Sequence, residues 1–292
     1  MDSVILFFVD GLGIGRRGDE NPLWQCDAGP LAYLVDEERE VELGGILART
    51  DATLGVEGRP QSASGQTTIL TGINAPKRLG RHKQGFPNEP LKEILREHSI
   101  FKRLNEAGTT PNLFANTYTP QFFEATPRWK SATTVAVEAA GLQFRKIPDL
   151  LGRMSLYHDF TNRSLRERGF DVPEFSPDDA AEILSGLAEN HRFVLYEHFI
   201  TDKIGHEMDM ERAKAHLPEL ASFLRKTVEK ADLGCTTVIL TSDHGNVENL
   251  SVRNHTLNKV PTVIWGRRAE ECAEKVKDLT DIAPLVRGLL SE

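Results

Sequence analysis

Residues 236–246, TTVILTSDHGN, decide the expected fold. They begin with the apolar run Val238–Leu240 beside β-branched residues, which is typical of a strand buried on both faces of a parallel sheet. They end in Asp243 and His244, which such a strand would deliver to its carboxyl end, where open α/β sheets place their binding sites. Asp and His are also side chains that bind zinc or manganese. Taken alone, the stretch fits a polar turn better, because short motifs often match by chance.

The charge of the chain limits its partners. The 292 residues carry a formal net charge of −8, with a pI of about 5.7. Binding of nucleic acid needs clustered Lys and Arg, so a nucleic-acid surface is not expected. A small phosphorylated substrate is compatible with an acidic chain, because metal ions can supply positive charge locally.

The cysteines and the apolar runs indicate a cytoplasmic protein. Cys26, Cys235 and Cys272 are odd in number and show no CxxC spacing, so we expect a reducing compartment and no disulfide framework. The apolar run Val4–Val9 is too short for a signal peptide or a membrane span, and no other run is long enough to cross a bilayer. We therefore expect no membrane partner.

Two further buried strands also end in polar groups. Val4–Val9 leads into Asp10, and the glycines that follow do not meet the G-x-G-x-x-G spacing of a dinucleotide loop. Phe193–Phe199 is followed by Asp202 and His206, which are four residues apart and would share one face of a helical turn. Three strands thus bring acids or imidazoles to their ends.

The alternation of strands and helices indicates an α/β fold, a doubly wound, mostly parallel sheet with helices on both faces. Without an internal repeat or a clear linker, residues 1–292 are expected to form a single domain. We expect Thr280 to cap the closing helix. Helices are predicted over residues 90–108, 131–140, 177–190, 209–231 and 281–290, and further strands over 112–115 and 262–265.

Several residues are candidates for binding an anion. Ser62 would lie at the N-terminus of a helix, where free backbone N–H groups favour an anion, although a serine at this place is commonly a simple helix cap. Arg81 and His82 stand in the densest basic patch, RLGRHK, and Asn116 follows a predicted strand. Arg81 and His82 could reach a substrate phosphate and Asn116 could contact the substrate, although each fits an ordinary surface or core position better.

The carboxyl ends of parallel strands lie along one edge of a sheet, so ligands distant in sequence can meet there. The candidate ligands at this edge are Asp10, Asp202, His206, Asp243, His244 and His255. They are more than one tetrahedral zinc needs and enough for two metals.

These residues carry a resemblance to the alkaline phosphatase superfamily, and most closely to the branch with cofactor-independent phosphoglycerate mutase and phosphopentomutase. The resemblance runs from the first strand to the last, and its ligand motifs stand in the family order. The matching segments are Asp10-Gly11, Ser62-x-x-Gly65, Asp202-x-x-Gly205-His206, Asp243-His244-Gly245-Asn246 and His255-Thr256-x-Asn258-x-Val260-Pro261.

The resemblance implies two divalent metal ions, Mn²⁺ or Zn²⁺, since magnesium suits imidazole less well. It places Asp202, His206 and His255 on one ion, and Asp10, Asp243 and His244 on the other. It also selects Ser62 as the nucleophile over Ser64, Thr67 and Thr68, because the family's nucleophile stands three residues before the motif glycine. A metal would activate this hydroxyl, which is otherwise a weak nucleophile.

The sequence departs from the mutases of this branch in two respects. Gln66 stands where they usually carry His, and the segment between Gly72 and Asp202 leaves room for at most a small lid within residues 75–177. A mutase must exclude water while its intermediate reorients. We therefore expect hydrolysis of a small phosphate ester, with a phosphomutase acting on phosphoglycerate or a sugar phosphate as the alternative. A non-catalytic metal-binding protein that keeps the fold is a further alternative. A sulfatase fits least, because the sulfatases of this family use a modified Cys or Ser in a different motif and no Cys lies near residue 62.

Overall fold

The fold, given by a computed structural model that describes residues 2–35, 39–125 and 129–291, is built on one seven-stranded sheet. Strand β1 (Ser3–Val9) lies in its centre, between β7 (Phe193–His198) and β8 (Thr236–Thr241), and pairs with both in parallel. Strand β4 (Asn112–Phe114) extends the parallel part on the far side of β7. The α/β fold class is thereby confirmed.

The other edge of the sheet is antiparallel. Strand β9 (Val260–Trp265) pairs antiparallel with β8, followed by β3 (Gly45–Thr50) and β2 (Glu40–Val41). No helix is assigned in the connection 242–259, so the chain returns along the neighbouring strand instead of crossing over it. The prediction of a mostly parallel sheet therefore holds for β4, β7, β1 and β8, and not for the edge formed by β9, β3 and β2.

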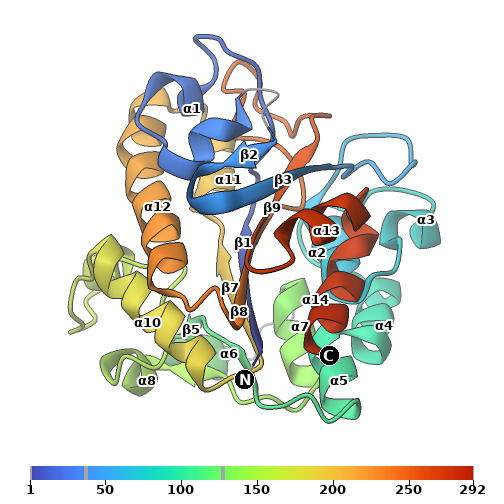
Figure 1. The fold of residues 1–292 in the computed structure, drawn as a ribbon, viewed down its shortest axis with the longest axis vertical. Coiled ribbons are helices and arrows are strands. Elements are labelled where there is room, and N and C mark those ends of the chain that lie inside the picture. Colours follow the sequence, from blue (N-terminus) through green and yellow to red (C-terminus); the bar gives the residue numbers. More distant parts are fainter. Residues whose placement is uncertain (1, 36–38, 126–128, 292) are drawn as a thin grey trace.

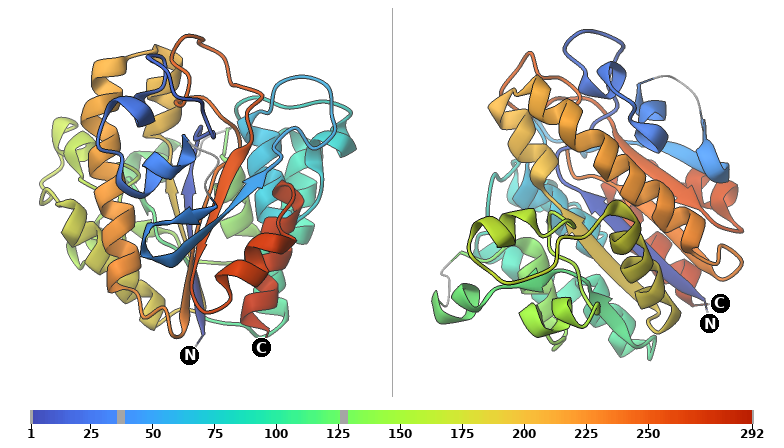
Figure 2. Two further views of the ribbon diagram at one scale, coloured as in Figure 1. Left: turned by 45° about the horizontal axis from the view of Figure 1, so that its top comes forward. Right: turned by 90° about the vertical axis from the view of Figure 1, so that its left-hand side faces the viewer.

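Helices cover both faces of the sheet, as Figures 1 and 2 show. The side chains of β1 alternate, so that Ile5 and Phe7 face one core and Leu6 and Phe8 the other. The first core is closed by α10 (Pro177–Glu189) and α12 (Met210–Lys230). The second core is closed by α2 (Ser62–Thr71), α4 (Glu89–His98), α5 (Ile100–Glu106), α7 (Ala132–Ala139), α13 (Ala269–Lys275) and α14 (Ile282–Leu290).

Two predicted helices differ from the structure. The helix expected over 90–108 is split into α4 and α5 at Ser99, whose backbone is extended and whose hydroxyl caps α5 by accepting from Lys102 N. Thr280 does not cap the closing helix. It lies within a 3₁₀ turn, Leu279–Asp281, for which Asp278 is the cap.

Smaller elements lie between β4 and α10. The strands β5 (Thr117–Tyr118) and β6 (Arg145–Lys146) form a separate parallel pair, accompanied by α6 (Pro120–Ala125), α8 (Ile147–Leu151) and α9 (Arg163–Glu167). The single domain and the small lid remain predictions. In the described part of the chain, no helix has the length and apolar character needed to span a membrane. The remaining short helices are α1 (Pro22–Gln25), α3 (Ala75–Leu79) and α11 (Ile200–Glu207).

Candidate metal centre

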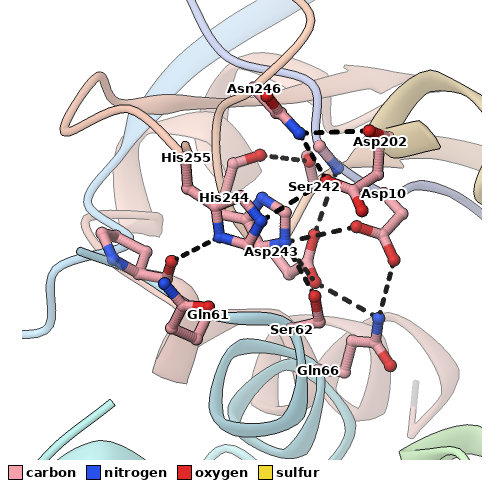
Figure 3. Close-up of polar contacts among 12 residues, drawn as sticks. Asp10, Gln61, Ser62, Gln66, Asp202, Ser242, Asp243, His244, Asn246 and His255 are labelled. Atoms are coloured by element: carbon pink, nitrogen blue, oxygen red, sulfur yellow. Dashed lines mark hydrogen bonds and ion pairs between the residues drawn. The ribbon is translucent and has the colours of Figure 1, made fainter. Parts of the chain in front are cut away.

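The carboxyl ends of the three central strands meet at one end of the sheet. Asp10 directly follows β1, and Asp243 and His244 follow β8. Asp202 and His206 lie on α11, which begins two residues after β7. The structure therefore brings the residues predicted from the strand ends to one place, as Figure 3 shows for the labelled ones.

The first cluster consists of Asp10, Asp243 and His244, all of them buried. The Nε2 atom of His244 lies 3.3 Å from Oδ1 of Asp10 and 3.5 Å from Oδ2 of Asp243. Oδ1 of Asp10 is buried without a hydrogen-bond partner among the described residues. A buried carboxylate oxygen needs compensation, and a cation between these side chains would provide it.

The second cluster consists of Asp202, His206 and His255. Each imidazole donates from Nδ1 to a backbone carbonyl, His206 to Arg253 and His255 to Pro60, both at 2.8 Å. In the neutral rings the Nε2 lone pairs therefore point into the cluster, although these two atoms lie only 3.2 Å apart. Facing lone pairs repel, so the arrangement suits a cation that both nitrogens bind.

The acid groups of the site also fit divalent cations. Burial, and then the charges of Asp243 and Asp202, raise the pKa of Asp10 well above its usual range. Burial and the charge of Asp202 raise the pKa of Asp243 to about 7. Because neighbouring like charges disfavour the ionised form, the carboxylates need added positive charge to stay ionised at neutral pH. The residues present therefore fit two metal ions.

Ser62 lies at the first helical position of α2, beside the first cluster. Its Oγ atom is 3.0 Å from Nε2 of His244. The helix approaches the first cluster closely, because a Cβ atom on Gly65 would lie 2.9 Å from the carbonyl oxygen of Asp243. The glycine of the Ser62-x-x-Gly65 motif thus allows α2 to bring the hydroxyl to the cluster.

Gln66 links the two carboxylates of the first cluster. Its Nε2 atom donates to Oδ2 of Asp10 at 3.0 Å and to Oδ2 of Asp243 at 3.2 Å. The sequence indicated only that Gln66 departs from the residue usual in mutases. The structure shows that this amide holds the two proposed ligands in a fixed relation.

Two supporting residues were not predicted from the sequence. Asn246 donates from Nδ2 to Oδ1 of Asp202 at 2.7 Å. Glu248 is buried and accepts from the backbone N–H groups of Gly13 at 3.0 Å and Asn246 at 2.7 Å, and also from Thr256 and Asn258. Glu248 therefore ties the loop after β1 to the loops that carry Asp243 and His255. Nothing in the local sequence marks this acid as buried.

The three candidate substrate residues do not gather around Ser62. Arg81 is exposed, and Nε2 of His82 lies 3.3 Å from the carbonyl oxygen of Val56. Neither is among the described residues that line the cavity beside Ser62. Asn116 does line it, but its amide bonds to the backbone N and O of Glu197 at 2.9 and 2.7 Å. A role in substrate binding stays a prediction for all three.

A cavity of about 540 Å³ opens beside the cluster. Asp10, Ser62, Gln66 and Asp202 line one end of it, and the opposite wall comes from residues between β4 and α11. Its volume is within the range of small-molecule sites. A substrate could thus place a phosphoryl group at Ser62 and its organic part in the cavity.

Comparison with known proteins bears on this geometry. Residues 172–291 match the family described as the metalloenzyme superfamily. This confirms the resemblance to alkaline phosphatase-like metalloenzymes. A relative from Sulfurimonas denitrificans, named 2,3-bisphosphoglycerate-independent phosphoglycerate mutase, is 32% identical over 129 residues. That match covers 41% of this chain and 26% of the relative, so the chain spans about a quarter of the mutase it matches.

Solved structures support the same fold at low identity. A cold-active alkaline phosphatase from Shewanella sp. is 12% identical, with a TM-score of 0.56 over 99% of this chain and 100% of that one. A protein from Pyrococcus horikoshii is 13% identical, with a TM-score of 0.56 over 99% of this chain and 97% of that one. At these identities the likeness establishes the alkaline phosphatase-like fold. The description of the matching family as metalloenzymes agrees with the two candidate metal-binding groups of the site.

Proposed function

We propose that this protein hydrolyses a small phosphate monoester through a phosphoserine at Ser62, with two divalent metal ions, Mn²⁺ or Zn²⁺, bound at the paired clusters. The observation that carries the proposal is the position of Ser62 Oγ, 3.0 Å from Nε2 of His244 and at the N-terminus of α2. The proposed ligands are Asp10, Asp243 and His244 for one ion and Asp202, His206 and His255 for the other.

The chain's own residues would carry the phosphoryl group in two displacements. Ser62 loses its hydroxyl proton to solvent, and its Oγ forms a bond to phosphorus while the bond from phosphorus to the ester oxygen breaks; the alcohol leaves with a proton from solvent. Water then attacks phosphorus, the bond to Oγ breaks, Ser62 regains a proton from this water, and inorganic phosphate departs. The N–H groups of Ser62 and Ala63, at the start of α2, would favour the negative charge of the phosphoryl oxygens. Bound cations would favour the ionised Ser62 hydroxyl and neutralise the phosphoryl oxygens.

Hydrolysis is supported over a mutase by what lies between Ser62 and Asp202. This segment supplies α4, α5, β4, α7, α10 and β7, which pack in the two cores or pair in the sheet. The remaining elements are short, the pair β5–β6 with α6, α8 and α9, and this favours at most a small lid over a large cap that would close over an intermediate and exclude water. The mutase alternative rests on the named relatives. A cytoplasmic location belongs to the same proposal and is supported by the three free cysteines.

The test is release of inorganic phosphate from a panel of monoesters, with protein reloaded with Mn²⁺ or Zn²⁺. Asp243→Asn and Ser62→Ala are run in parallel. Release by the wild type and its loss in both variants is the expected result. If the wild type releases no phosphate but interconverts phosphoglycerates or sugar phosphates, the hydrolase is wrong and the mutase stands.

A further inference from the structure

The cavity beside Ser62 has a cluster of aromatic side chains in its wall. Tyr118 packs against Phe114 and Phe122, whose ring centroids lie 6.1 and 4.6 Å from its own, and all three line the cavity. The hydroxyl of Tyr118 is bonded to Thr134 at 2.9 Å, so its polar atom already has a partner within the protein. This part of the wall therefore offers mainly ring surface to a ligand.

A second group of rings lines the cavity next to α11. The imidazole of His158 lies 4.0 Å from the ring of Phe199 and 4.1 Å from that of Tyr157, measured between centroids. Burial, and then the charge of Lys203, lower the pKa of His158 to about 3, so this imidazole is neutral at neutral pH. Phe199 directly precedes α11 and stands three residues before Asp202, so these rings border the second cluster.

Phe86 reaches the cavity from the loop between α3 and α4. The loop is tied to α2, because the N–H of Ser64 donates to the carbonyl oxygen of Lys83 at 3.3 Å and the N–H of Lys83 donates to Oγ of Ser64 at 3.0 Å. Phe86 follows three residues after Lys83, a span of at most about 11 Å of chain. It lines the cavity at 49% exposure, as does Trp129 at 59%. Two exposed aromatic side chains at one cavity indicate a surface that an apolar group covers on binding.

Several polar side chains of the cavity already have partners in the protein. The amide of Asn116 is bonded to the backbone of β7 on both sides, at 2.7 and 2.9 Å. The hydroxyl of Thr117 is bonded to Ser155 at 2.7 Å, and that of Ser131 to Thr134 at 2.9 Å. A ligand rich in hydroxyl groups would therefore find much of the hydrogen-bonding capacity of this wall in use.

The charged residues of the cavity lie beside the proposed metal ligands. Glu197 pairs with Phe8 across the sheet and so shares a face with Asp10, whose pKa its charge helps to raise. Lys203 is exposed, directly follows Asp202, and is the one Lys or Arg among the described residues that line the cavity. A carboxylate on the organic part of a substrate would meet the charge of Glu197 as well as that of Lys203. An uncharged organic part avoids this repulsion.

We propose that the cavity selects phosphate monoesters whose alcohol carries an uncharged aromatic ring. The proposal rests on the proposed function and deepens it. A ring would bury its surface against side chains such as Phe86, Tyr118 and Phe199. The hydroxyls of a glycerol phosphate, or the carboxylate of a phosphoglycerate, would lose water on entry without gaining equivalent partners.

Three esters of three-carbon primary alcohols test this selection. They are 3-phenylpropyl phosphate, propyl phosphate and glycerol 1-phosphate, which carry a terminal ring, no further group, or two hydroxyls. Glycerol is the most acidic of the three alcohols, so its better leaving group works against the predicted order. For the wild type with bound Mn²⁺ or Zn²⁺, kcat/KM should be highest for the phenylpropyl ester, by at least about tenfold over the other two. Equal values, or a preference for glycerol 1-phosphate, would overturn the proposal.

Phe86→Ala tests the aromatic wall without opening the core, because the ring it removes is already half exposed. This variant should lower kcat/KM for the phenylpropyl ester by about three- to tenfold more than for the propyl ester. Trp24→Ala is the matched control, since Trp24 is 48% exposed and is not among the described residues that line the cavity. It should keep the wild-type ratio between the two esters. An unchanged ratio in Phe86→Ala would contradict the role of this ring.

A binding arm separates this inference from the proposed function. The phosphonates 4-phenylbutylphosphonate and butylphosphonate, which cannot be hydrolysed, are titrated by calorimetry into metal-loaded Ser62→Ala, with and without Phe86→Ala. Tighter binding of the phenyl compound, weakened by Phe86→Ala, supports the cavity assignment even if no ester is hydrolysed. Equal affinities, or no binding of either, would contradict it. Hydrolysis of all three esters without preference for the ring would overturn this inference and leave the proposed function standing.

Discussion

Ser62 and His244 are 182 residues apart in sequence, and the hydroxyl oxygen of one lies 3.0 Å from Nε2 of the other. The contact places a serine against the imidazole of a proposed metal ligand, at a helix N-terminus. Both features would favour a nucleophilic serine oxygen.

Replacing Ser62 with Ala should therefore lower phosphate release by at least about 10³-fold, the scale seen when a nucleophile is removed from an enzyme. The variant should still bind two metals per chain, because Ser62 is outside both ligand sets. Colorimetric phosphate release and elemental analysis of the same samples would check this. Retained activity with full metal content would contradict the role of Ser62.

Gln66 should stabilise the protein most when metal is absent. Its amide donates to Asp10 and Asp243, so Gln66→Leu leaves two buried carboxylate oxygens without a donor. We expect a loss of about 1–3 kcal/mol in the free energy of unfolding with chelator present, and a smaller loss with Mn²⁺ bound. Urea unfolding measures both, with Gln143→Leu at an exposed position as the control. An equal loss with and without metal would show that Gln66 acts independently of the clusters.

Glu248 should govern metal affinity without touching the ions. It accepts hydrogen bonds from Gly13 and Asn246, and Asn246 in turn donates to Asp202. Glu248→Gln would place an amide N–H against these donors and shift the loops that carry the ligands. Such outer partners typically contribute 10- to 100-fold in affinity, so we expect a loss of about that size. Competition with a chromogenic chelator would measure it, and wild-type affinity would contradict this role.

His198 should make the protein sensitive to acid. It is fully buried, with Nε2 2.8 Å from Nε2 of His216 and Nδ1 2.9 Å from the carbonyl oxygen of His158. Burial, and then the neighbouring imidazoles, lower the pKa of His198 well below its usual value. The unfolded chain, with a His pKa of about 6.5, then binds more protons than the folded one below that pH.

The free energy of unfolding should therefore fall as pH decreases below about 6.5, by at most about 1.4 kcal/mol per pH unit from this residue. His198→Gln should flatten that part of the curve, and His191→Gln, outside this cluster, serves as the control. Urea unfolding in the presence of chelator would measure the free energy of unfolding between pH 7 and pH 5. These pH values lie around the ordinary His pKa of about 6.5. Parallel curves for the wild type and His198→Gln would contradict the prediction.

The first cluster could be predicted because it follows from local patterns. Buried apolar runs identify β1 and β8, and a parallel pair must bring Asp10, Asp243 and His244 to the same edge. The same argument could not give the direction of β9, because the sequence pattern of a buried apolar strand is the same whether it pairs parallel or antiparallel with its neighbour. The break at Ser99 does have a local signal, a serine that can cap α5, but the helical periodicity on both sides obscures it.

The supporting contacts could not be predicted in this way. Gln66 and Glu248 act through partners far away in the chain, such as Asp243 and Gly13, and only the packed structure brings these groups together. Glu197 lies within the apolar run FVLYEHF, where a single acid does not reveal which cavity it lines. Strand ends thus indicated the proposed ligands, whereas the groups that would orient them depend on tertiary contacts.

The central claim is that Ser62 itself carries the phosphoryl group. The most direct measurement mixes the metal-loaded protein with a phosphate monoester, quenches it in acid within the first turnover, and locates the phosphate by peptide mass spectrometry. We predict phosphate on Ser62, with its decay matching the rate of phosphate release. Steady turnover with Ser62 unmodified at every quench time, or phosphate found on another residue, would contradict the account.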